Sequence, residues 1–156
     1  MRKKGAFVAV SGGIDSSTTA ALCVRALGPE HVFALLMPEK DSNRESLHFG
    51  KILVQHLGIP YQVIDIGPIL ESMGCYQYRD EAIYEIIPEY SPDWKNKIVL
   101  TGGSETGSRI NFFSVVVESP EGVQFQKRLP WKNYLQVVAA TNMKQRTRKS
   151  LEYFHA

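Results

Sequence analysis

The sequence predicts an α/β fold in which helices cover both faces of a doubly wound parallel sheet. Two observations lead to this prediction. Short apolar runs typical of buried strands alternate with segments whose apolar residues recur at helical spacing. Glycine or proline closes most of these segments. A strand–helix–strand–helix–strand series of this kind favours parallel strands joined by right-handed crossovers.

The alternation is clearest in the first half of the chain. We expect strands at residues 6–10, 32–37 and 61–66, and helices at 16–27 and 47–57. Gly28-Pro29 ends the first helix and Gly58 ends the second. Asp41, Ser42 or Asn43 is expected to cap the start of the second helix.

The pattern becomes looser after Gly67. We expect here a helix at 78–87, a loop at 89–97, a polar stretch at 101–107, and strands at 110–118 and 123–129. The last two segments flank Ser119-Pro-Glu-Gly122, which is a good signal for a β-hairpin. Residues 140–155 have helical composition and contain neither glycine nor proline.

The composition indicates an ordinary globular protein. The chain has 156 residues, 44% of them hydrophobic, and a formal net charge of +2. This weak charge does not argue for a nucleic-acid or membrane partner. The two isolated cysteines favour a reducing compartment, and the apolar run behind the basic start is too short for a signal peptide. We therefore expect a soluble, cytoplasmic protein.

The segment with the strongest chemical signal is Ser11-Gly12-Gly13-Ile14-Asp15-Ser16-Ser17. It lies between the first predicted strand and the first predicted helix, where open α/β sheets bind phosphates. Glycines allow a tight turn and a close approach of backbone N–H groups to an anion. The serine hydroxyls add donors, and the Asp15 carboxylate fits this anionic site if it holds Mg²⁺. The alternative is a plain glycine turn that joins strand to helix.

This segment is similar to the S-G-G-x-D-S signature of the PP-loop ATP-pyrophosphatase superfamily. The resemblance implies a Rossmann-like sheet of the adenine nucleotide α-hydrolase type. It also implies that ATP is cleaved between its α and β phosphates and that AMP passes to an acid or amide oxygen. The whole segment would then bind ATP, with Ser11, Asp15 and Ser16 catalytic and Asp15 on Mg²⁺. No lysine follows the glycines, so this is not the loop of kinases and GTPases.

Three further segments resemble the NAD synthetase family: Leu35–Pro38, Leu57–Ile66 and Asn142–Arg148. The resemblance implies that Leu36 and Met37 line the adenine site and that Arg146 meets the pyridine dinucleotide. It implies a ligase that adenylates deamido-NAD and aminates it with ammonia. A homodimer is also implied, and a glutaminase partner remains open as the source of ammonia.

The chain is expected to be a single ATP-pyrophosphatase domain, 1–156, that is incomplete at its C-terminal end. The resemblance covers residues 5–70 and 140–156, so residues 74–139 are expected to be a divergent region in which the hairpin resembles an insertion. Two alternatives stay open for its function. In the first, the chain is another kind of PP-loop enzyme, amidotransferase-like or tRNA-modifying, that acts on a different acceptor. In the second, it is a truncated, non-catalytic module that binds ATP.

Overall fold

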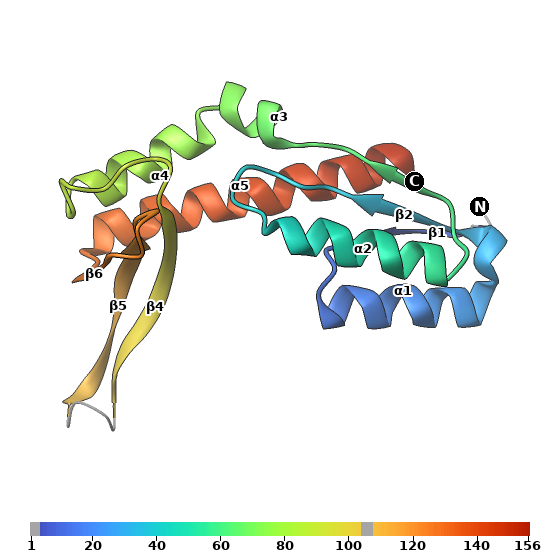
Figure 1. The fold of residues 1–156 in the computed structure, drawn as a ribbon, viewed down its shortest axis with the longest axis horizontal. Coiled ribbons are helices and arrows are strands. Elements are labelled where there is room, and N and C mark those ends of the chain that lie inside the picture. The colour runs from blue at the N-terminus through green and yellow to red at the C-terminus, as the bar shows by residue number, and fades with distance from the viewer. Residues whose placement is uncertain (1–3, 104–107) are drawn as a thin grey trace. The chain divides into compact units, whose positions relative to one another are not determined.

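A computed structural model describes residues 4–103 and 108–156, and it divides the chain into two compact units. The first unit comprises residues 1–70 and 145–156, and the second comprises residues 71–144. Figure 1 shows the elements of both. Part of the polar stretch predicted at 101–107 lies outside the described residues. Within the described residues, no helix combines the length and the apolar character that crossing a bilayer requires.

The first unit is built on a parallel sheet with the strand order β1-β2-β3. Its strands are β1 (Ala6–Ala9), β2 (Val32–Leu36) and β3 (Tyr61–Val63). The connections contain α1 (Ile14–Leu27), the short 3-10 helix η1 (Pro29–His31) and α2 (Arg44–His56). This arrangement confirms the predicted α/β class, because the crossovers join parallel neighbours in sequence order.

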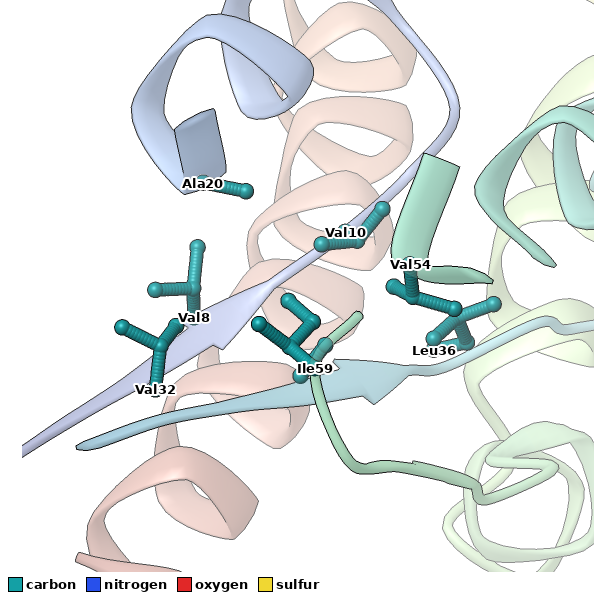
Figure 2. Packing of buried hydrophobic residues seen from close by; sticks show 8 residues of the cluster. Val8, Val10, Ala20, Val32, Leu36, Val54 and Ile59 are labelled. Carbon is teal, nitrogen blue, oxygen red and sulfur yellow. The ribbon is translucent and has the colours of Figure 1, made fainter. Parts of the chain in front are cut away.

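Alternation along the strands gives the sheet two different faces. Val8, Val32 and Leu36 point to one side, where they pack with Ala20 of α1 and Val54 of α2 (Figure 2). Both helices therefore cover the same face, as successive crossovers of one hand require. On the other face, the rings of Phe7 and Phe33 lie 5.3 Å apart, and the ring of His155 lies 6.3 Å from Phe7. His155 ends α5 (Trp131–His155), so helices cover both faces.

Local signals explain where the elements of this unit begin and end. The side chain of Asn43 accepts a hydrogen bond from the Glu45 N–H, which identifies the cap among the three predicted candidates. Strand β3 is shorter than predicted, since Asp65 turns the chain and accepts a hydrogen bond from the Gly67 N–H. Helix α3 (Gly67–Ser72), which the sequence pattern did not indicate, follows directly.

The second unit contains an antiparallel sheet with the order β4-β5-β6. Its strands are β4 (Lys95–Gly103), β5 (Ser108–Glu118) and β6 (Gln124–Arg128). The pairing of β5 with β6 confirms the predicted hairpin. The loop predicted at 89–97 is wrong at its end, because residues 95–97 pair with β5. Figure 1 shows β4 and β5 as a long two-stranded ribbon.

Two helices complete the core of the second unit. Ala82 and Ile83 of α4 (Cys75–Tyr84) pack with Val115 of β5 and Val137 of α5. Helix α5 begins nine residues earlier than the 140–155 segment predicted, directly after Pro130. Pro130 provides the carbonyl that accepts the first hydrogen bond, from the Tyr134 N–H.

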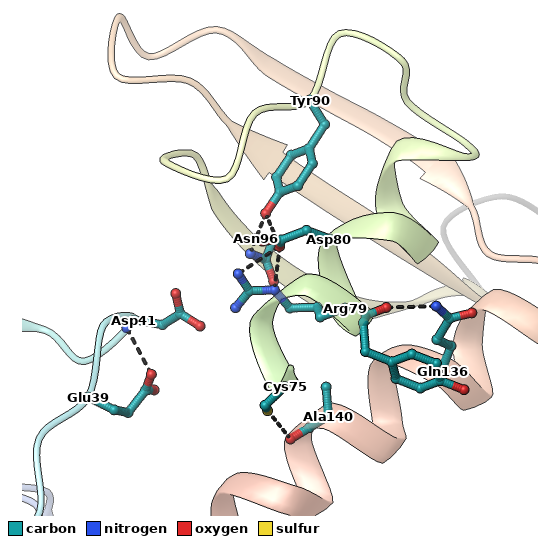
Figure 3. A network of polar contacts seen from close by, with 10 residues as sticks. Glu39, Asp41, Cys75, Arg79, Asp80, Tyr90, Asn96, Gln136 and Ala140 are labelled. Carbon is teal, nitrogen blue, oxygen red and sulfur yellow. Dashed lines mark hydrogen bonds and ion pairs between the residues drawn. The ribbon is translucent and has the colours of Figure 1, made fainter. Parts of the chain in front are cut away.

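A polar network lies beside this core (Figure 3). The guanidinium of Arg79 contacts the Asp80 carboxylate, with 2.7 Å between Nη2 and Oδ1. The same Oδ1 accepts a hydrogen bond from the Tyr90 hydroxyl, which in turn accepts one from the Asn96 amide. The buried Cys75 thiol donates to the Ala140 carbonyl. These bonds satisfy groups that would be costly to bury alone.

A matched pair of substitutions in α2 tests the core of the first unit. Val54 is fully buried, whereas Ile52 on the same helix is 48% exposed. We expect Val54→Ala to lower the free energy of unfolding by about 2 kcal/mol, because it removes buried methyl groups and leaves a cavity. Ile52→Ala should cost far less. Urea unfolding followed by far-UV circular dichroism measures both, and equal losses would contradict this packing.

Candidate active site

The loop between β1 and α1 turns at Gly12, whose φ is +79°. A side chain is disfavoured by this backbone conformation alone. The space around Gly12 is also closed by the start of α2. A Cβ atom on Gly12 would lie 2.2 Å from the Ser46 carbonyl oxygen and 3.2 Å from the Gly50 nitrogen. The first glycine of the motif therefore allows the backbone of the loop to approach the backbone of α2 closely.

The hydroxyl groups of the loop fold it on itself. The Ser11 N–H donates to Ser16 Oγ at 3.1 Å, and the two hydroxyl oxygens of these residues lie 3.0 Å apart. The hydroxyls of Ser16 and Ser17 both donate to the Gly13 carbonyl, at 3.0 and 2.8 Å. Three serines are thus brought together around one turn of backbone. Their bonds hold the loop in a single shape.

The start of α1 is open to a ligand. Gly13 is the N-cap residue and provides no side chain, and the first intrahelical bond runs from the Ser17 N–H to the Gly13 carbonyl. The N–H groups of residues 14–16 therefore precede the hydrogen-bonded helix and have no intrahelical acceptor. The helix dipole adds positive potential there. Asp15 is exposed in this first turn. The arrangement suits a phosphate with a cation beside it.

A cleft of about 450 Å³ lies next to the loop in the first unit. Its buried residues come from the ends of the first two strands, among them Leu36 and Met37, which are 1% and 7% exposed. The rest of the lining comes from the β2–α2 turn, α2 and α5, and it is polar apart from Pro38 and Leu47. The lining consists of Ala9, Val10, Ser11, Leu35, Leu36, Met37, Pro38, Ser42, Asn43, Ser46, Leu47, Gln145, Arg148, Lys149 and Glu152.

The wall formed by α5 carries two cations, each beside a carboxylate. Nη2 of Arg148 lies 4.0 Å from Oε1 of Glu39, and Nζ of Lys149 lies 2.5 Å from Oε2 of Glu152. The hydrogen bond from Glu152, together with its negative charge, raises the pKa of Lys149 above its ordinary value. Lys149 therefore remains charged near neutral pH.

The structure brings together some of the residues that the sequence singled out. Ser11, Leu36 and Met37 line one cleft, and residues 12–17 continue from Ser11 in the loop. Arg146 is exposed and does not belong to the lining. Its predicted contact with a dinucleotide stays a prediction, as do the ligand roles of the other residues.

Sequence reasoning missed the polar residues of α5 that face the cleft. Residues 145, 148, 149 and 152 follow the spacing i, i+3, i+4, i+7, which places them on one face of a helix. This spacing is visible in the sequence. It becomes informative, however, only when the structure shows which face of the helix lines the cleft. Ser46 had no local signal at all.

A parallel sheet whose first strand leads through a glycine turn into an open helix start defines the Rossmann-like class of α/β proteins. Within this class, the family model described as NAD synthase matches residues 1–89. The chain belongs to the NAD synthase family.

Two relatives match the whole chain. The NH(3)-dependent NAD(+) synthetase of Rhizobium meliloti (strain 1021) is 52% identical over all 156 residues, which cover 46% of that protein. The protein of the same name from Rhizobium rhizogenes (strain K84) is 44% identical, with 47% of its length covered. The chain thus spans about half the length of the curated relatives it matches. Because the first alignment covers the whole chain, residues 74–139 have counterparts in that relative.

Among solved structures, the NH3-dependent NAD synthetase from Campylobacter jejuni is 42% identical over the matched part. The match covers 47% of this chain and 32% of that chain, with a TM-score of 0.44.

The two glycines of the loop should respond differently to substitution. Gly13 has a φ of −84°, and a Cβ there would meet only Ser11 Oγ at 3.5 Å. We expect Gly12→Ala to destabilise the protein by roughly 1–3 kcal/mol through backbone strain and collision with α2. Gly13→Ala should cost less than about 1 kcal/mol. Urea unfolding of both variants measures the difference, and a larger loss for Gly13→Ala would overturn this account.

Proposed function

We propose that this chain binds ATP and takes part in an ATP-dependent amide-forming ligation. The observation that carries the proposal is the glycine loop with its open helix start, placed beside an apolar-floored cleft. Membership of the NAD synthase family supports it. The relatives are named NH(3)-dependent NAD(+) synthetases, which favours NAD as the product and ammonia as the nitrogen donor.

In the proposed reaction, a carboxylate oxygen of deamido-NAD attacks the α-phosphorus of ATP. The bond between this phosphorus and the bridging oxygen breaks, and pyrophosphate leaves with the electron pair. Ammonia then attacks the acyl carbon of the adenylate, loses a proton, and displaces AMP to give the amide. Such a sequence needs little acid–base chemistry, because positioning and charge stabilisation carry it.

The loop residues would hold the departing pyrophosphate. The backbone N–H groups of residues 14–16, which have no acceptor within the helix, would be the donors. The bonds from the Ser16 and Ser17 hydroxyls to the Gly13 carbonyl fix these N–H groups before the ligand arrives, and this lowers the cost of organising them around the developing charge. The hydroxyls of Ser11, Ser16 and Ser17 would donate to the ligand after leaving their partners within the loop.

Mg²⁺ fits this site in the way it usually binds nucleotides. The described residues hold no group of three or more His, Cys, Asp and Glu side chains that suits a metal. The exposed Asp15 is a single carboxylate at the phosphate end, and Mg²⁺ commonly takes one or two carboxylates together with phosphate oxygens and water. When bound, the ion would neutralise negative charge on the pyrophosphate.

The remaining roles concern the nucleoside and the second substrate. Leu36 and Met37 would form the adenine site at the cleft floor. Arg146, exposed on α5, would meet the pyridine dinucleotide. We further propose a homodimer in the cytoplasm. A glutaminase partner would be needed only if free ammonia does not serve as the nitrogen donor.

Asp15→Asn tests the proposal, with Asp93→Asn as a control at an exposed position of the second unit. We expect the chain to bind ATP with Mg²⁺ in isothermal titration calorimetry. Asp15→Asn should weaken binding about tenfold or more, equivalent to about 1.4 kcal/mol. When a chelator removes Mg²⁺, the wild type and Asp15→Asn should bind ATP with the same affinity. Absence of ATP binding by the wild-type chain would refute the proposal.

Pyrophosphate exchange into ATP then distinguishes the acceptors. Exchange that depends on deamido-NAD supports the synthetase reaction. Exchange with other acids only would indicate a PP-loop enzyme with a different acceptor. ATP binding without exchange for any acid would indicate a nucleotide-binding module.

A further inference from the structure

The cleft has two walls of different electrostatic character. One carries Ser11, next to the glycine loop and the positive start of α1. The other comes from α5 and presents Arg148 and Lys149, each beside a carboxylate. Since each cation there is offset by an anion, this wall is poorly suited to attract phosphates. It suits the uncharged nucleoside part of a ligand.

The turn between β2 and α2 contributes Pro38, Ser42 and Asn43 to the lining of the cleft, and it is bonded to itself. The Ser42 N–H donates to the Glu39 carbonyl at 2.9 Å, and the Glu39 N–H donates to Ser42 Oγ at 3.1 Å. The Asp41 N–H donates to Glu39 Oε2 at 3.0 Å. Glu39 thus organises the turn through its backbone and its side chain together.

Arg148 reaches this turn at two points. Its Nε donates to the Met37 carbonyl at 3.4 Å, and its Nη2 lies 4.0 Å from Glu39 Oε1. The side chains of Arg148 and Glu39 are 25% and 6% exposed, so solvent screens their attraction little. Two separated contacts from one planar guanidinium fix both the direction and the distance of the turn relative to α5.

We infer that Arg148 is a positioning residue for the nucleoside of the nucleotide. It clamps the Met37–Ser42 turn onto α5, and this keeps the nucleoside end of the cleft in the shape that accepts the base and ribose. The inference rests on the proposed function for the identity of the ligand. It assigns to Arg148 no contact with phosphate.

Two ligands separate this role from phosphate binding: AMP, which carries the nucleoside, and inorganic pyrophosphate, which lacks it. We expect Arg148→Gln to weaken binding of ATP and AMP about tenfold, because the turn is released, while pyrophosphate affinity stays within about twofold. Arg148→Lys should not restore binding, since a single ammonium cannot make both contacts. Arg25→Gln, on the exposed side of α1, is the matched control and should leave all three affinities unchanged.

A second measurement needs no ligand. Amide hydrogen exchange at Asp41 and Ser42 reports opening of the turn, and we expect it to rise severalfold in Arg148→Gln but not in Arg25→Gln. Glu39→Gln removes the charge while keeping the size of the side chain. Amide exchange at Asp41 and Ser42 should also rise in this variant, which provides the test if Arg148→Gln fails to fold.

The outcomes are distinct. An equal loss of pyrophosphate and AMP affinity would show a phosphate contact and overturn the inference. Unchanged ATP affinity in Arg148→Gln would overturn it while leaving the proposed function intact. Wild-type chain that binds neither ATP nor pyrophosphate would refute the proposed function and with it the nucleoside role. Unchanged amide exchange in both Arg148→Gln and Glu39→Gln would refute the clamp itself.

Discussion

The contact between the Gly12 backbone and the first turn of α2 is the constraint on which the site depends. It leaves no room for a Cβ atom, so the loop and α2 are held at backbone distance. Helix α2 also begins at the Asn43 cap. Its first residues therefore contact the loop on one side and follow the β2–α2 turn on the other. The loop and the β2–α2 turn, which both contribute to the lining of the cleft, are therefore positioned by one helix start.

The sequence predicted the first unit well because its signals are local. A strand such as β1 is an apolar run closed by glycines. The loop after it combines glycine, serine and aspartate residues in a pattern typical of phosphate binding. Membership of the α/β class follows from the order of such segments. Boundaries were less accurate where a turn residue such as Asp65 ends a strand before the apolar pattern does.

Elements that depend on distant partners were harder to predict. Lys95–Lys97 carry no strand pattern of their own, and pairing with β5 makes them part of β4. The first turns of α5 hold bulky and β-branched residues with weak helix propensity, and packing of Val137 into the second core offsets this. The orientation of Arg148 likewise depends on the sheet that α5 covers, which no window of sequence contains.

The division of charge in the cleft also limits how a nucleotide can lie there. Free N–H groups and the only carboxylate of the loop are at the start of α1, whereas the α5 wall is balanced in charge over buried apolar residues. Reversing the ligand would place its phosphates against Glu152, which lines the α5 wall, and remove them from the helix dipole. Both changes are unfavourable. In the proposed function, the triphosphate would therefore lie over the loop and the base over Leu36 and Met37, while Arg148 would shape the α5 side of the cleft.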